Sequence, residues 1–408
     1  MNRSCEFRTL RSVLLSALLA VSTANAASLP GFRAELLGTT SGFVTSLAVA
    51  SDGTLYYSTV SGDIVRFDNG VNTVVAHLPT EAAGDAGLLG LALLDDRTAV
   101  VHYTTPGQTE EIISRVDLIT GEKSIVQGFV CDITLPGRSV SAEHHGGNPI
   151  VTDDGFIYFG IGDFGGGAIA ALPEWNGGKI FRIAPDGTMT QIARGFRNPF
   201  DMAWDPEHRR IVVCDNGTMA DDEINIVDGV AGFYGWPFTA GNGPPIEGAI
   251  PPIYTFPEVV APTGMIRLNG ANSFLKRGYL IGAFVTKAIY YVLDIDARPL
   301  PDPIALLKGD TGSIVDVAQT STGDIVFTTG SAIYRLDPPL RGDCNGDGRV
   351  TLADLDALRR EVADGTVATV AAPASWGCDA NGDGLISSAD LITIAQMIGL
   401  RLRAVRVR

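Results

Sequence analysis

The stretch SDGTLYYSTVSGDIVRF, residues 51–67, is the part of the sequence that decides the fold class. It contains a turn rich in Gly and Asp, an alternating strand, a second turn and a second strand that ends in Ile-x-Arg-apolar. This order is typical of a β-hairpin. The pattern returns at DDGFIYF (153–159) with GKIFRI (178–183), and again at STGDIVF (321–327) with SAIYRL (331–336).

Weaker copies of this unit begin near Leu88, Phe200 and Met265. The chain therefore holds six units at spacings of roughly 45 to 60 residues, with about four short strands in each, which is typical of a β-propeller. A β-sandwich is the rival all-β fold, but a sandwich does not repeat six times. We expect a six-bladed β-propeller over residues 27–338, with function on the face where the loops between blades converge.

Composition limits the classes of function. The chain has 408 residues, 45% of them hydrophobic, which permits one large domain and one small domain. The formal net charge is −16, and no basic cluster precedes the last eight residues. Nucleic-acid binding needs a Lys/Arg footprint, so a nucleic-acid partner is excluded from the expectations.

The N-terminus has the features of a secretory signal peptide. Three Arg residues within residues 1–11 precede an apolar run at 13–21, and Ala24-Asn25-Ala26 supplies a small-residue cleavage site. A membrane anchor is the alternative, but this run is too short to cross a hydrocarbon core of about 30 Å as a helix. We expect residues 1–26 to be removed and the protein to be secreted or periplasmic, with no membrane span.

Removal of the signal peptide leaves four cysteines, which permits two disulfides in an oxidising compartment. Cys344 and Cys378 bracket the C-terminal segment and are the expected pair. For Cys131 and Cys214, a second disulfide and two buried thiols both remain open.

Beyond a short linker at 339–342, two segments match the template of a calcium-binding loop, in which oxygen ligands at alternating positions wrap a hard cation around a sharp Gly turn. We expect each loop to lead into an amphipathic helix, at residues 352–362 and 389–398. The predicted ligands are Asp343, Asn345, Asp347, Arg349 and Asp354 in the first loop and Asp379, Asn381, Asp383, Leu385 and Asp390 in the second.

These two loop-and-helix repeats resemble the type I dockerin module over residues 343–400. The resemblance implies a cohesin-type protein partner. The positions that steer partner choice in that family are Leu352-Ala353 and Ser388-Ala389, which are unlike pairs. The alternative is a calcium-stapled terminal module without a cohesin partner. Residues 401–408 are expected to form a solvated basic tail.

Four loop segments of the predicted propeller carry polar groups suited to chemistry. Glu143-His144-His145-Gly146-Gly147 offers an imidazole base beside backbone that a ligand can approach. Gly195-Phe196-Arg197-Asn198-Pro199 offers a permanent positive charge for an oxyanion or a quinone oxygen. The segment at 215–225 gathers carboxylates that repel one another unless a cation lies among them. The fourth segment, 84–90, contains one carboxylate, Asp85.

The motifs H-x-G-G, G-x-R-N-P and D-E-I-N…Y-G-W-P occur in this order, and together they resemble the glucose/sorbosone dehydrogenase family over about residues 31 to 338. The resemblance implies a six-bladed propeller that oxidises aldose sugars at the anomeric carbon. It also implies a pyrroloquinoline quinone (PQQ) cofactor held by calcium at the mouth of the channel.

The same resemblance implies a role for individual residues. His144 is the expected base, Asp163 its support, and Arg197 the group that polarises the quinone oxygen. The carbonyls of Gly217 and Thr218 are expected to bind the cofactor's calcium ion, and Glu223 and the Tyr234 carbonyl a second, structural one. The expected polar contacts of the cofactor are Asp85, Asn198, Asn216, Gly217 and Thr218.

One departure from the family pattern weakens the expectation of PQQ binding. The cationic positions that neutralise the three PQQ carboxylates align here with Val285, Ser313 and Val315, and Lys287 and Arg267 are the candidate substitutes. A non-catalytic, calcium-stabilised propeller that binds carbohydrate or protein is therefore the alternative function. A lactonase-like hydrolase is a third possibility, but it needs a side-chain carboxylate on the channel metal, and none is evident.

Overall fold

The computed structural model describes residues 32–130, 143–229, 231–272, 274–309, 311–363, 373–383 and 385–399. The predicted signal peptide, Cys131 and the basic tail lie outside these ranges, so the predictions made for them remain predictions. None of the helices in the described ranges has the length and apolar character needed to span a membrane.

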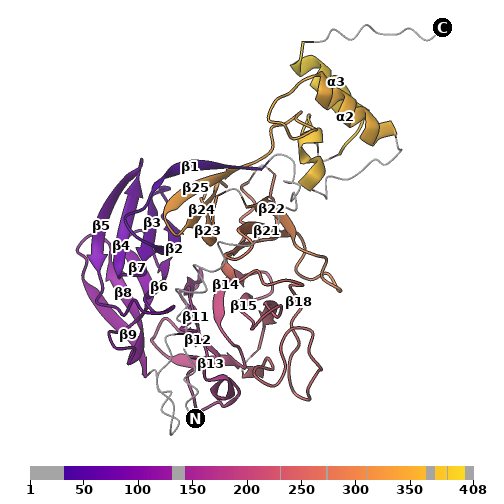
Figure 1. The fold of residues 1–408 in the computed structure, drawn as a ribbon. Coiled ribbons are helices and arrows are strands. Elements are labelled where there is room, and N and C mark those ends of the chain that lie inside the picture. Colours follow the sequence, from indigo (N-terminus) through magenta and orange to yellow (C-terminus); the bar gives the residue numbers. More distant parts are fainter. Residues whose placement is uncertain are drawn as a thin grey trace, which may run out of the picture.

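Six small sheets form a ring of six blades, which confirms the predicted propeller (Figure 1). The quoted hairpin lies where the sequence predicts it, since Leu55 pairs with Phe67 and Tyr57 with Val65. Blade 1 contains β2 (Val44–Val49), β3 (Leu55–Thr59), β4 (Asp63–Asp68) and β5 (Val71–His77). Blade 2 contains β6 (Leu88–Leu93), β7 (Thr98–Thr104), β8 (Glu110–Asp117) and β9 (Lys123–Val130). Blade 3 contains β10 (Ile150–Val151), β11 (Ile157–Ile161), β12 (Lys179–Ile183), β13 (Met189–Arg194) and β17 (Gly232–Phe233). Blade 4 contains β14 (Pro199–Asp205), β15 (Arg210–Asp215), β16 (Glu223–Val227) and β18 (Tyr254–Thr255). Blade 5 contains β19 (Pro262–Arg267), β20 (Tyr279–Ala283), β21 (Ala288–Val292) and β22 (Ile304–Lys308). Blade 6 contains β23 (Ile314–Gln319), β24 (Ile325–Thr329), β25 (Ala332–Asp337) and β1 (Arg33–Thr39).

The first strand closes the ring. β1 pairs antiparallel with β25, from Arg33 opposite Asp337 to Thr39 opposite Ala332, and so completes the last blade. Sequence analysis did not predict this pairing, because the two strands are separated by almost the whole propeller.

The strands β2, β6, β10, β14, β19 and β23 line the central channel and contact one another around it. All six run in the same direction, so the residues that precede them gather at one end of the ring. We call this end the loop face. It contains the segments of Asp85, His144 and Arg197, which precede β6, β10 and β14.

A cavity of about 310 Å³ occupies the channel end opposite the loop face, and Asp201 and Asp316 lie in its wall. Asp316 accepts hydrogen bonds from Leu47 N (2.6 Å) and Ser46 Oγ (3.1 Å) of the next blade. Asp201 accepts one from Met265 N (2.8 Å), also of the next blade. These carboxylates satisfy backbone N–H groups near strand bulges and tie neighbouring blades together.

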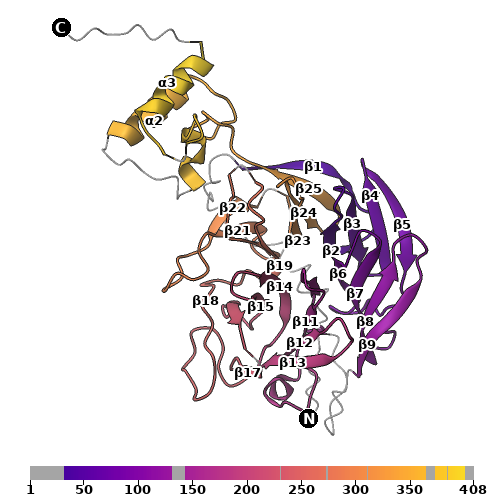
Figure 2. The same ribbon diagram turned by 180° about the vertical axis from the view of Figure 1, so that it is seen from behind.

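The C-terminal segment forms a separate small unit beside blades 5 and 6 (Figures 1 and 2). It contains α2 (Leu352–Ala363), the short 3-10 helix η2 (Pro373–Cys378) and α3 (Ser388–Met397). The predicted disulfide between Cys344 and Cys378 is present, and Cys214 is a buried free thiol. Trp376 anchors this unit, since it is only 4% exposed and its ring centroid lies 5.3 Å from that of Phe32 and 5.9 Å from that of Tyr291.

Candidate active site and calcium loops

His144, the predicted base, lies at a sharp bend of the loop that precedes β10. Its φ is 59°, in the left-handed region, and its side chain is 14% exposed. Its ring Nδ1 lies 2.6 Å from Oδ1 of Asp163, and its backbone N–H donates to Oδ2 of Asp85 at 2.6 Å. Asp85, predicted as a cofactor contact, therefore fixes the backbone of the base.

Asp163 is surrounded by hydrogen-bond donors. Besides His144, Trp236 Nε1 (2.8 Å) and the backbone N–H groups of Gly165 (2.9 Å) and Gly167 (3.0 Å) donate to it. Burial alone raises the pKa of Asp163, but the His144 contact and the other donors outweigh burial and lower that pKa. Asp163 is thus ionised at neutral pH. Trp236 belongs to the quoted Y-G-W-P motif, although the sequence assigned it no role.

Arg197 is held by the end of β15. Its backbone N–H donates to Asp215 Oδ2 at 3.0 Å, and the Asn198 N–H donates to Asp215 Oδ1 at 2.6 Å. The Arg197 guanidinium donates through one nitrogen to the carbonyl oxygens of Asn216 (2.9 Å) and Gly217 (2.6 Å). Asp215 is therefore a positioning carboxylate for this segment, a role that the sequence did not reveal.

Hydrogen bonds connect the His144 loop and its partner Asp163 directly to the Arg197 loop. The Asp163 N–H donates to the Arg197 carbonyl at 2.8 Å, and the Gly146 N–H donates to Asn198 Oδ1 at 3.1 Å. The structure thus brings the predicted base, its carboxylate and the predicted guanidinium to one part of the loop face. The side chain of Asn198, predicted as a cofactor contact, supports the His144 loop.

The predicted second calcium position lies beside a small cavity of about 60 Å³ that Glu223 and Tyr234 line. Glu223 accepts hydrogen bonds from the Gly241 N–H and from Asn225 Nδ2. Within the described ranges, the buried Oδ1 of Asn225 has no hydrogen-bond partner. Burial, followed by the charges of neighbouring aspartates, raises the pKa of Glu223. A buried carboxylate beside an unsatisfied amide oxygen is a donor set that suits a calcium ion.

The three positions that align with the family's cations lie on or near the loop face. Val285 is 53% exposed on the turn between β20 and β21, Ser313 is half-buried, and Val315 is buried. Lys287 lies on the same turn as Val285 and is exposed. Arg267 ends β19 at the opposite end of the ring, where it pairs with Asp205 (3.5 Å) and Glu207 (3.4 Å). Arg267 therefore cannot substitute for the missing cations, and Lys287 is the remaining candidate.

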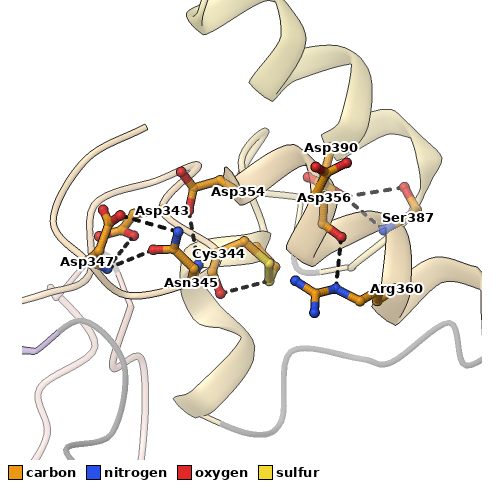
Figure 3. Close-up of a disulfide and its surroundings, with 10 residues drawn as sticks. Asp343, Cys344, Asn345, Asp347, Asp354, Asp356, Arg360, Ser387 and Asp390 are labelled. Carbon is orange, nitrogen blue, oxygen red and sulfur yellow. Dashed lines mark hydrogen bonds between the residues drawn. A yellow bond between two sulfur atoms is a disulfide. The ribbon is translucent and has the colours of Figure 1, made fainter. Parts of the chain in front are cut away.

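The first calcium loop brings its predicted carboxylates together (Figure 3). Carboxylate oxygens of Asp343, Asp347 and Asp354 lie within 4.8 Å of one another. Asp354 accepts a hydrogen bond from Asn345 N at 3.0 Å, and Asp343 accepts one from Gly348 N at 2.7 Å. These contacts fold the segment into a loop whose oxygens converge.

The second loop repeats the contact of the closing aspartate. Asp390 accepts from Asn381 N at 3.1 Å, and Asp379 accepts from Gly382 N at 2.8 Å. Ser387 caps α3 in a capping box with Asp390. The carbonyl roles of Arg349 and Leu385 stay predictions, and Gly384 lies outside the described ranges.

The fold and the loop-face residues define a six-bladed β-propeller of the sugar dehydrogenase type, followed by a small module with two loops. The chain belongs to the Glucose / Sorbosone dehydrogenase family, whose model matches residues 44–335. A model of the dockerin type I domain matches residues 341–399. This membership supports an oxidoreductase of the sugar dehydrogenase type as the general class.

Relatives of known name agree with this assignment. The chain is 28% identical over 242 residues to quinoprotein glucose dehydrogenase B of Acinetobacter calcoaceticus; the match covers 44% of this chain and 47% of that protein, so it spans about half of the relative. The PQQ-bound aldose sugar dehydrogenase of Streptomyces coelicolor has a similar fold, with a TM-score of 0.66, 22% identity and coverage of 76% of this chain and 98% of that one. For the apo aldose sugar dehydrogenase of Escherichia coli these values are 0.65, 18%, 75% and 99%.

Proposed function

We propose that this protein is an exported oxidoreductase that oxidises aldose sugars or related carbohydrates with PQQ and calcium on the loop face. The observation that carries the proposal is the hydrogen bond between His144 and Asp163, together with the hydrogen bond from the Asp163 backbone N–H to the Arg197 carbonyl. The N-terminal sequence pattern of residues 1–26 supports export.

The pair of His144 and Asp163 is suited to remove a proton from a sugar hydroxyl. The ionised Asp163 can only accept a hydrogen bond, so the Nδ1 of His144 is the donor and carries the hydrogen. In the neutral ring, Nε2 then has a free lone pair. Nε2 is then the acceptor for the hydroxyl proton, and Asp163 stabilises the imidazolium that forms. His144 is partly exposed, so a substrate can approach it.

PQQ would supply the acceptor for the hydride that leaves the sugar carbon. The reacting end of such a quinone fits the donors present, because Arg197 offers a fixed positive charge beside the His144 loop. The carbonyls of Gly217 and Thr218 are the groups that would hold the calcium, and Asn216, whose Oδ1 is buried and has no partner among the described residues, is a polar contact for the cofactor. The Gly217 carbonyl now accepts from Arg197, so a calcium ion there would replace that hydrogen bond.

The carboxylate end of PQQ fits this chain poorly. Charge-assisted contacts are typically worth about 1.5 to 3 kcal/mol each, and Val285, Ser313 and Val315 supply none. Loss of three such contacts weakens binding by orders of magnitude. We therefore propose that Lys287 is the remaining cation for this end and that the affinity for PQQ is low for the family.

The replacement of three family cations by Val285, Ser313 and Val315 favours a second candidate function. A loop face without these cations can bind carbohydrate or protein without catalysis. The C-terminal module is proposed, in either case, to bind two calcium ions and a cohesin-type partner, since the dockerin model and the converging carboxylates of the first loop support this role.

Purified protein, PQQ and calcium decide between these candidates. We expect PQQ to bind and an aldose panel to reduce an artificial electron acceptor. His144→Ala is expected to lower turnover by about 10² to 10⁴-fold, the usual contribution of a general base. The control is His208→Ala, at an exposed histidine that pairs with Asp205 away from the loop face. Absence of PQQ binding at micromolar concentration would leave the non-catalytic function.

A further inference from the structure

A second group of titratable side chains lies directly behind the His144 loop. Glu111 of β8, His102 of β7 and His145 are all fully buried. Glu111 Oε1 lies 2.6 Å from His145 Nδ1, and Glu111 Oε2 lies 3.1 Å from His102 Nε2. Thr104, which pairs with Glu111 across the two strands, donates its hydroxyl to the same carboxylate at 3.1 Å.

His102 also reaches the loop itself. Its Nδ1 lies 3.0 Å from the carbonyl oxygen of Gly147. Two contacts therefore connect blade 2 to the loop on the C-terminal side of His144: one through the His145 ring, the other through the Gly147 carbonyl.

The partners of His102 determine where its hydrogens lie. The Gly147 carbonyl can only accept a hydrogen bond, and an ionised Glu111 can only accept as well. Burial alone raises the pKa of Glu111, but the contacts with His102 and His145 outweigh burial and lower that pKa to about 2. Both ring nitrogens of His102 therefore face acceptors, and donation from both would make His102 an imidazolium in a buried ion pair with Glu111.

Apolar aromatic rings surround this ion pair. The His102 ring centroid lies 6.4 Å from that of Phe159, and the His145 ring meets Phe164 edge-on at 5.3 Å. The rings of Phe159 and Phe164 belong to the apolar cluster between blades 2 and 3. A charge in such surroundings is costly when it loses its partner, so the geometry of the pair is strongly held. Among the described residues, Asp85, which also acts on His145 through its charge, and Asp163, which contacts the His144 ring, are further titratable groups that face this loop.

We propose that the buried pair of His102 and Glu111 is a positioning device for the base, an inference that rests on the role proposed above for His144. His144 has a φ of 59°, a conformation that a non-Gly residue keeps only when its surroundings enforce it. Asp85 holds its N–H, and the Glu111 pair holds the next three residues through His145 and Gly147. The imidazole is thereby aimed at Asp163 before any substrate arrives.

Histidine NMR tests the proposal without any activity measurement. The chain has only 5 histidines, so ¹⁵N-labelled imidazole signals can be assigned with single variants. At neutral pH we expect His102 to show hydrogen on both ring nitrogens, whereas His144 shows it on Nδ1 alone. A neutral His102 in the wild-type protein overturns the proposal, whether or not the protein oxidises sugars.

Glu111→Gln tests whether the pair acts on His144. We expect this variant to turn His102 neutral, to shift the ¹⁵N signals of His144, and to lower kcat by about 10 to 100-fold with little change in KM. The control is Glu110→Gln, at the adjacent exposed glutamate, which should change none of these.

His102→Gln provides a second route if Glu111→Gln does not fold, because it removes the cation and keeps one donor. A folded variant of either residue with unchanged His144 signals overturns the positioning role. If the wild-type protein shows the expected NMR signals but does not oxidise sugars, the proposed function is refuted and the inference of the ion pair is retained.

Discussion

Asp163 on the loop face of the propeller and Asp343 in the first predicted calcium loop are carboxylates whose surroundings act in opposite ways. At the loop face, the donors around Asp163 outweigh its burial and lower its pKa. In the calcium loop, burial and then the charges of Asp354 and Asp347 raise the pKa of Asp343. Hydrogen-bond donors of the chain itself satisfy Asp163, whereas the carboxylates of the C-terminal loop repel one another. We therefore expect this loop to depend on a bound cation.

Removal of calcium should separate the two regions most strongly. With calcium at about 1,000 times its Kd, binding to the folded module contributes about 4 kcal/mol, and a chelator withdraws this contribution. We expect the thermal transition of the C-terminal module to move down in calorimetry, while that of the propeller stays in place. Asp354→Asn should mimic the chelator, and Asp356→Asn, an exposed helix position, should not. Identical thermal profiles with and without chelator would contradict the comparison.

Trp376→Ala should uncouple the module from the propeller. Its indole packs against Phe32 and Tyr291, and loss of such a buried ring costs about 3 kcal/mol. We expect the variant module to melt earlier and independently, and limited proteolysis to cleave between the two regions. Trp376→Phe keeps an aromatic ring and is the matched control. Unchanged melting of Trp376→Ala would show that this contact does not hold the module.

Arg33→Gln should have the smallest effect. The Arg33 guanidinium lies 3.4 Å from Asp343 Oδ2, a predicted calcium ligand, and the Arg33 side chain is 51% exposed. Such exposed pairs are worth about 0.2 to 1 kcal/mol, so removal of the competing cation should tighten calcium binding by at most about five-fold. Calcium titration by calorimetry measures this, with Arg66→Gln on blade 1 as the control. Weaker calcium binding in Arg33→Gln would contradict the competition.

The blades were predictable because their signal is local. Each hairpin combines turn residues with period-two alternation inside about 17 residues, and residues 51–67 form β3 and β4 as expected. The pairing of β1 with β25 was not predictable in this way, because no local pattern in residues 33–39 names a partner near residue 335. The same limit applies to Arg267, since only the direction of β19 places it away from the loop face.

Site residues that belong to recognisable motifs could be predicted from the sequence, whereas site residues inside strands could not. His144 and Arg197 came from motifs whose order resembles the family, Asp163 came from a role that this resemblance implies, and the structure gathers all three. Glu111 and His102 gave no signal, because a single polar residue in an alternating strand has the same pattern whether it faces solvent or a buried partner. Asp215 was part of a recognised acidic segment, but its contact with the Arg197 backbone depends on tertiary packing.

The closure of the last blade by β1 has a consequence for how the chain folds. A ribosome delivers residue 33 long before residue 337, so the first strand must wait for its partner until the whole propeller has been made. Contacts between residues this far apart are slow to form, and ring closure is expected to be a late step. Until then β25 exposes an unpaired edge, which is the stage at which a second chain could pair with it by mistake.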